Sequence, residues 1–201
     1  MYRRQPTASN PRRSLPFWYS RGYLPHFATN VTAQIVTYRL ADSLARATVA
    51  FLLRDRERLR NEVAFRKKIE TYMDAGYGAC HLRCPEIAAI VRDSFNYFDG
   101  ERYVLHAYVI MPNHVHVLVD VRAPYELSAI VRRWKSGTAR SINRHLGRKG
   151  PLWKSDYWDR YIRDDAHYMD AVEYILQNPV KAGLVKEPTA WPGTWVRDEL
   201  H

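Results

Sequence analysis

Two β-rich runs separated by a Pro-Asn turn constrain the fold of this chain more than any other feature. RYVLHAYVIM precedes the turn and HVHVLVDV follows it. Such runs around a turn signal are typical of an antiparallel hairpin. Because side chains alternate between the two faces of a strand, Val115 and Val117 are expected to bury against helices. His114 and His116 would then share the opposite face.

The other predicted elements surround this hairpin and indicate one layered domain. They are, in order, a strand at 33–40, a charged helical stretch at 45–74, helices at 85–98 and from 125, a strand within 152–163 and a helix at 164–178. Pro179 disfavours helical geometry at Asn178, so the last helix is expected to end there. The pattern predicts an α+β sandwich with a small, mostly antiparallel sheet and flanking helices.

The charge balance favours a polyanionic partner. Lys and Arg number 31 against 21 Asp and Glu, a formal charge of +10. Residues 1–30 hold five arginines and no acid, which predicts a basic, flexible arm before a single domain at 31–190 and a tail at 191–201. No apolar run is long enough to span a membrane, and the N-terminus lacks a secretory pattern, so we expect a soluble, cytoplasmic protein.

Residues 132–163 form the most basic segment of the predicted domain. They hold ten Lys and Arg against two Asp, with tryptophans and tyrosines interleaved. Cations for the backbone and aromatic rings for the bases are typical of single-strand binding. The alternative is an amphipathic helix with a solvated basic side and core tryptophans. The best candidates for phosphate contacts are Arg132, Arg133, Lys135 and Arg140.

The paired histidines are candidate metal ligands, although histidines satisfied by backbone or solvent are the alternative. Two imidazoles at i and i+2 of a strand can converge on one cation. In VEYILQNP, Tyr174 and Asn178 are neighbours one turn apart on a helix. An Asn oxygen beside a Tyr hydroxyl would suit Mg²⁺ or Mn²⁺. Spacing alone also allows Tyr174 to be a half-buried aromatic residue.

MPNHVHVLV, followed some sixty residues later by VEYILQNPVKAGLV, resembles the REP-associated tyrosine transposases. These form a branch of the single-tyrosine HUH transposases, in which HUH denotes His, a hydrophobic residue and His. WKSGTARSIN and PLWKSDYWDRYIRD also resemble stretches of these proteins. The resemblance covers roughly 19–195.

This resemblance implies a ferredoxin-like or RRM-like fold, with His114, His116 and Asn178 as ligands of Mg²⁺ or Mn²⁺ and Tyr174 as nucleophile. It implies nicking and joining of single-stranded DNA through a 5′-phosphotyrosine, on REP-like palindromic hairpins, by a monomer or a homodimer. A non-catalytic nucleic-acid-binding module with the same fold, and a zinc hydrolase of small nucleotides, are the rival hypotheses.

Overall fold

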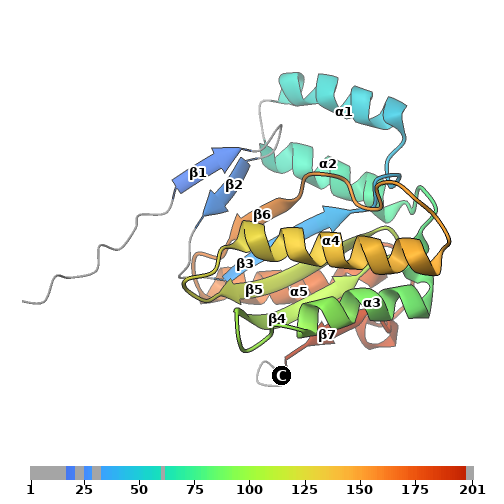
Figure 1. Cartoon of the computed structure of the whole chain (residues 1–201). Helices are drawn as coiled ribbons and strands as arrows, with labels where there is room; N and C mark the ends of the chain where they lie inside the picture. Colours follow the sequence, from blue (N-terminus) through green and yellow to red (C-terminus); the bar gives the residue numbers. More distant parts are fainter. Residues whose placement is uncertain (1–16, 21–24, 29–32, 60–61, 198–201) are drawn as a thin grey trace, which may run out of the picture.

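Five strands pair antiparallel throughout in one sheet, in the order β6-β3-β5-β4-β7 (Figure 1). The structure is a computed structural model that describes residues 17–20, 25–28, 33–59 and 62–197. The strands of this sheet are β3 (Ala33–Arg39), β4 (Tyr103–Ile110), β5 (His114–Val121), β6 (Trp158–Tyr161) and β7 (Thr194–Val196).

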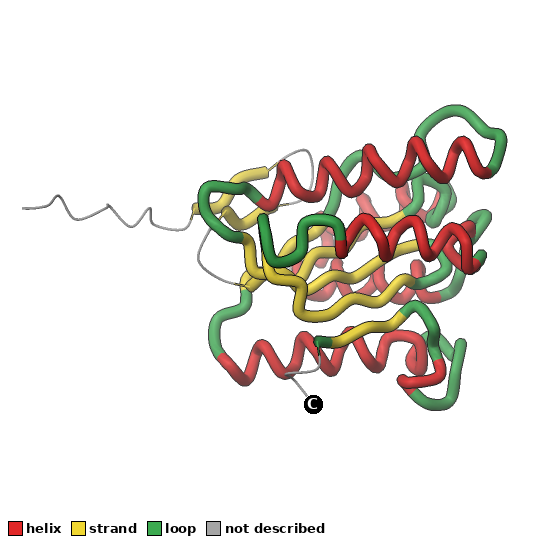
Figure 2. Tube along the Cα trace, turned by 60° about the horizontal axis from the view of Figure 1, so that its bottom comes forward, coloured by secondary structure: helices red, strands yellow, loops and turns green. Residues whose placement is uncertain are grey.

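Helices lie on both faces of this sheet (Figure 2). α3 (Pro85–Asn96) and α4 (Leu127–His145) pack together over one face, and α5 (Asp165–Lys181) crosses the other. We call these the α3–α4 face and the α5 face. The succession β3-α3-β4-β5-α4-β6, with β3 and β5 central, is the ferredoxin-like arrangement. The predicted α+β sandwich is confirmed.

Strand β5 shows how the sequence pattern produces the two faces. Val115, Val117 and Val119 are fully buried in the core beneath α3 and α4. Leu118 belongs to the second core, which packs against α5. His114 and His116 share the side of Leu118, because residues two apart on a strand face the same way. The predicted hairpin therefore places both histidines on the α5 face.

Two further helices follow β3 in the chain. α1 (Arg46–Leu59) and α2 (Glu62–Asp74) take the place of the single charged stretch expected at 45–74, and residues 60–61 between them lie outside the described ranges. A third apolar cluster joins them to strand β6. Its buried members include Leu52, Phe65, Met73 and Trp158.

The ends of the chain contain more strand than the sequence suggests. β1 (Phe17–Ser20) pairs with β2 (Pro25–Ala28) inside the expected arm, and the rest of that arm lies outside the described residues. β7 lies in the expected tail and pairs with β4. Single-turn helices η1 (His81–Arg83) and η2 (Pro188–Ala190) complete the described elements. No helix in the described ranges is long and apolar enough to cross a membrane.

Helix α5 continues past Asn178, so its predicted end there is wrong. Pro179 lies inside the helix and is buried. Proline removes one N–H from the helix, but the bonding pattern resumes directly after it. The Ala182 N–H donates to the Asn178 carbonyl at 3.0 Å, and the Leu184 N–H donates to the Pro179 carbonyl at 2.9 Å in the bond that closes the C-terminus of the helix. These bonds and the burial of the ring offset the lost one.

Candidate metal and nucleophile site

The two histidines of β5 lie buried beneath α5. His114 is 1% exposed and His116 is not exposed, and their ring centroids are 4.9 Å apart. Burial lowers the pKa of both imidazoles, to about 3 at His114, and neighbouring positive charge adds to the effect. Both rings are therefore neutral near pH 7, the form in which imidazole binds a metal ion.

A hydrogen-bond chain fixes the tautomer of His114. The Asn113 side-chain amide donates to the Met73 and Tyr77 carbonyls at 3.1 and 2.9 Å, which orients its Oδ1 toward His114 Nδ1 at 2.8 Å. Oδ1 only accepts, so Nδ1 carries the hydrogen and Nε2 presents a lone pair. That Nε2 has no hydrogen-bond partner among the described residues.

His116 is held in a similar way by strand β3. Its Nδ1 lies 2.7 Å from the Thr37 hydroxyl, while its Nε2 faces α5. There, Nε2 lies 3.4 Å from the Tyr174 hydroxyl and 3.4 Å from the Asn178 side-chain nitrogen. The structure thus brings together all four residues that the sequence singled out for metal binding and nucleophilic attack.

Tyr174 and Asn178 reach the histidines from one face of α5. The Tyr174 ring centroid lies 5.0 Å from that of His116, edge to face, and 5.5 Å from the Lys181 ammonium. Burial raises the pKa of Tyr174 well above that of a free phenol, and Glu70 and Asp74 raise it further. The hydroxyl is therefore protonated in this arrangement.

Two acidic residues of α2 complete the cluster, and the sequence reasoning missed both. Glu70 is a hydrogen-bond partner of the Tyr174 hydroxyl. Asp74 Oδ1 lies 3.6 Å from His114 Nε2 and has no hydrogen-bond partner among the described residues. Burial, followed by the charge of Glu70, raises the pKa of Asp74 to about 6, against a lowering effect of Lys181. The only sequence signal was an acidic pair four residues apart on a helix.

The donor atoms around His114 and His116 fit a hard divalent cation. Three buried acceptors there lack any hydrogen-bond partner in the described part of the chain, namely His114 Nε2, Asn178 Oδ1 and Asp74 Oδ1. Unpaired buried acceptors are costly unless a cation or proton lies between them. Within the same ranges, His, Cys, Asp and Glu alone form no ready three-ligand group, so the set depends on the Asn178 carboxamide.

A cleft of about 340 Å³ opens beside Tyr174 between α2, α5 and the β3–β6 edge of the sheet. This volume is within the usual range for pockets that hold small organic groups such as a nucleotide. Three of its lining side chains are cationic, namely Lys67, Arg160 and Lys181, against two acidic ones, Glu70 and Asp159. The cleft therefore offers a place for an anionic group next to the Tyr174 hydroxyl.

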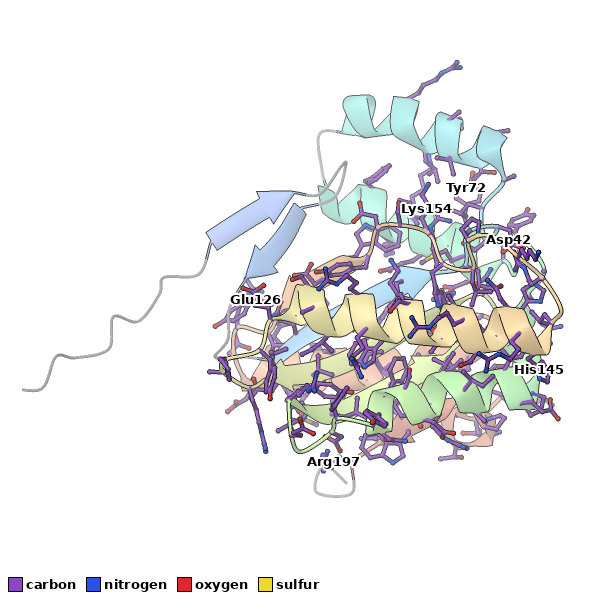
Figure 3. The ribbon with its side chains drawn as sticks, in the orientation of Figure 1. Asp42, Tyr72, Glu126, His145, Lys154 and Arg197 are labelled. Atoms are coloured by element: carbon purple, nitrogen blue, oxygen red, sulfur yellow. The ribbon has the colours of Figure 1, made fainter. Side chains whose placement is uncertain are left out.

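The four predicted phosphate-binding residues lie on the α3–α4 face, across the sheet from this cluster. Figure 3 shows α4 running between the labelled Glu126 and His145. Arg132, Arg133 and Arg140 are exposed there. Arg133 also lies over the Phe98 ring, with its guanidinium carbon 4.8 Å from the ring centroid.

Lys135, the fourth candidate, is hydrogen-bonded to the segment before β6. Its ammonium donates to the Ser155 and Asp156 carbonyls at 2.8 and 3.2 Å. Burial lowers its pKa to about 8, although Asp156 opposes the shift. Lys135 and Arg132 line a second cavity, of about 490 Å³, between α4 and residues 150–157.

The aromatic residues expected to stack on bases are mostly core residues. Trp134 is 2% exposed, Trp153 and Tyr157 are 6% exposed, and Trp158 is 8% exposed. The Trp134 N–H donates to the Tyr103 hydroxyl at 3.0 Å. For these four rings, the interpretation as a stacking platform is wrong, and the amphipathic alternative describes them.

The fold defines a class of protein: a five-stranded α+β domain of ferredoxin-like topology with helices on both faces of the sheet. A solved structure of a REP-associated tyrosine transposase bound to a REP hairpin shares the fold, with a TM-score of 0.53 and 18% identity, over 88% of this chain and 81% of that one. The family model described as "Transposase IS200 like" matches residues 86–178. The matched stretch runs from α3 to Asn178 and includes His114, His116 and Tyr174.

Two curated relatives match this chain over part of its length. A REP-associated tyrosine transposase of Escherichia coli (strain K12) is 31% identical over 97 residues, which cover 48% of this chain and 56% of the relative. A putative REP-associated tyrosine transposase of Haemophilus influenzae is 30% identical over 96 residues, covering 43% and 54%. The matches thus span about half the length of these relatives. The predicted relationship to the REP-associated tyrosine transposases is confirmed.

Proposed function

We propose that this protein is a metal-dependent enzyme that nicks and rejoins single-stranded DNA, with Tyr174 as its nucleophile and REP-like hairpins as substrate. The observation that carries the proposal is the Tyr174 hydroxyl 3.4 Å from His116 Nε2, within a buried group of unpaired acceptors. A nucleophile beside a cation site is the arrangement that covalent phosphodiester exchange requires.

In the first step, Tyr174 Oη attacks the scissile phosphorus and forms a 5′-phosphotyrosine. The P–O3′ bond breaks, and the 3′ oxygen takes a proton from solvent, which leaves a free 3′-hydroxyl on the other strand segment. Glu70, the hydrogen-bond partner of the phenol, is placed to accept its proton. In the second step, a 3′-hydroxyl gives its proton to solvent and attacks the phosphotyrosine, and Tyr174 leaves and recovers the proton held by Glu70. The energy of the phosphodiester bond is conserved, so no ATP is needed.

His114, His116 and Asn178 would hold Mg²⁺ or Mn²⁺, which supplies a Lewis acid that polarises the phosphate and favours the phenolate. The raised pKa of Tyr174 makes such assistance necessary near pH 7. The helical scaffold of α5 keeps the phenol oriented toward the cleft, where Lys67 and Lys181 can pair with the substrate phosphates.

The test is covalent trapping of a labelled hairpin oligonucleotide with Mn²⁺, separated by denaturing electrophoresis. We expect wild-type protein to form an adduct and Tyr174→Phe to form none while binding the hairpin with unchanged affinity. Tyr168→Phe, which removes another hydroxyl from α5, is the matched control and should form the adduct. An adduct that persists in Tyr174→Phe would refute the nucleophile assignment, and its absence from wild type on any hairpin would favour a non-catalytic binding module.

A further inference from the structure

We propose that Asp74, at the end of α2, is an additional ligand of the metal site and joins α2 to the sheet through the bound cation. This inference rests on the proposed function, because it deepens the same site. The family match begins at residue 86, after α2, so it does not include Asp74.

The lone pairs of His114 and Asp74 point toward each other. His114 Nδ1 carries the hydrogen because it faces the Asn113 Oδ1, so His114 Nε2 presents only a lone pair toward Asp74. Asp74 Oδ1 faces that nitrogen at 3.6 Å. An ionised carboxylate and an unprotonated imidazole nitrogen are both acceptors, and two acceptors facing each other are stabilised by a cation between them.

The distance between Asp74 Oδ1 and His114 Nε2 fits two ligands of one ion better than a hydrogen bond. At 3.6 Å, the two atoms are too far apart for a good hydrogen bond. Two ligand atoms each ~2.1 Å from one octahedral cation lie ~3 Å apart. A small closure around an ion would therefore bring Asp74 Oδ1 and His114 Nε2 to ligand separation, whereas neither atom has another hydrogen-bond partner in the described structure.

The charge of the ligand set also favours a carboxylate at this site. Two neutral imidazoles and a neutral carboxamide bring no negative charge to a divalent ion. A carboxylate is the ligand that Mg²⁺ and Mn²⁺ use most in proteins, and the Asp74 carboxylate directly faces the buried histidine nitrogen. Its addition makes the set two imidazoles, one carboxamide and one carboxylate.

The packing of α2 is suited to hold this ligand in place. Phe65, Ile69 and Met73 on the buried side of α2 belong to the cluster that contains Trp158 of β6. The Met73 carbonyl also accepts a hydrogen bond from Asn113, the residue that orients His114. The same short segment therefore positions both the imidazole and the carboxylate, and the cation would lie where α2, β5 and α5 meet.

The test is Mn²⁺ binding, measured by calorimetry and by water-proton relaxation, on the full chain without DNA. Wild type should bind one Mn²⁺, and Asp74→Asn and Asp74→Ala should weaken binding at least about tenfold. In Asp74→Ala, the bound ion should gain one fast-exchanging water where the carboxylate was. Asp170→Asn removes an acid from an exposed position of α5 and should bind Mn²⁺ as wild type does.

Three outcomes separate this inference from the proposed function. If Asp74→Asn and Asp74→Ala bind Mn²⁺ like wild type with unchanged hydration, Asp74 is not a ligand, although the Tyr174 chemistry stands if the adduct still forms. If binding falls in both while their melting temperatures without metal match wild type, misfolding is excluded and the assignment holds. If Tyr174→Phe binds Mn²⁺ normally but wild type forms no adduct, the metal site is real and the proposed reaction is wrong.

Discussion

The two faces of strand β5 differ more than their shared backbone suggests. On the α3–α4 face, Val115, Val117 and Val119 continue an unbroken apolar core. On the α5 face, the equivalent layer contains His114 and His116, with buried acceptors that have no hydrogen-bond partner in the described structure. Burying such groups costs stability, and groups of this kind are typical of functional sites. One face is organised for folding, and the other carries the residues that we propose bind an ion.

The largest expected effect comes from comparing neighbours on the two faces. We expect His116→Leu to lower adduct formation on the order of 10³-fold or more, because it removes a metal ligand beside Tyr174. Its melting temperature should stay close to wild type, since Leu118 already packs on the same face. Thermal denaturation and trapping assays on the same preparations check both values.

Val117→Ala is the matched change on the α3–α4 face. Truncation of this fully buried side chain should cost about 2 kcal/mol of unfolding free energy. For a chain of this size, the melting temperature should fall roughly 4–8 °C. Adduct formation at a permissive temperature should be retained. If Val117→Ala abolishes the adduct while folded, or His116→Leu preserves it, the division between the faces fails.

The second prediction is that Mn²⁺ stabilises the protein through the α5 face. An ion that binds only the folded state adds about 2.7 kcal/mol at 100-fold excess over Kd. We expect a rise in melting temperature of roughly 5–10 °C, reversed by EDTA. His116→Leu should lose this shift, whereas the exposed Arg140→Ala, on α4, should keep it. An equal shift in both variants would place the ion elsewhere.

The same comparison explains how much could be predicted from the sequence. The hairpin and the two-face arrangement of β5 followed from local alternation, and the proximity of Tyr174 and Asn178 followed from helical spacing. Both signals are short-range. The meeting of β5 with α5 was implied by the resemblance, and spacing alone did not give it.

Long-range packing decided what the sequence did not show. Which acids of α2 reach the site depends on how that helix docks, and docking is set by contacts such as Phe65 and Met73 against Trp158 of β6. Trp153 illustrates the same limit: its N–H donates to the Thr138 hydroxyl on α4 at 2.9 Å. An amphipathic pattern alone does not give the side to which such a ring points, because that depends on which element packs against it.

The third prediction concerns the α3–α4 face. If α4 contacts DNA phosphates, Arg132→Ala should weaken hairpin binding and lower the slope of log K against log salt by about 1. Arg133→Ala should have a smaller effect, because its guanidinium also lies over Phe98. Mn²⁺ affinity should stay unchanged in both. Fluorescence anisotropy from low to high salt is the measurement, and unchanged salt slopes would move the DNA path away from α4.

The smallest expected effect is a pH dependence from Lys135. Its folded pKa is lowered to about 8 by burial, so the free protein carries this charge at pH 7 and loses most of it by pH 9. A phosphate at the third N–H would favour the charged form, so hairpin affinity should fall a few-fold as pH rises through 8.

Lys135→Arg is the variant that isolates this charge. Arginine stays charged over the whole range, so the variant should remove the pH step while Arg132 and Arg140 contribute equally at both pH values. Anisotropy at pH 7 and pH 9 and constant ionic strength gives the comparison. The same few-fold fall in Lys135→Arg would show that another group titrates, and that Lys135 only fastens the segment before β6 through the Ser155 and Asp156 carbonyls.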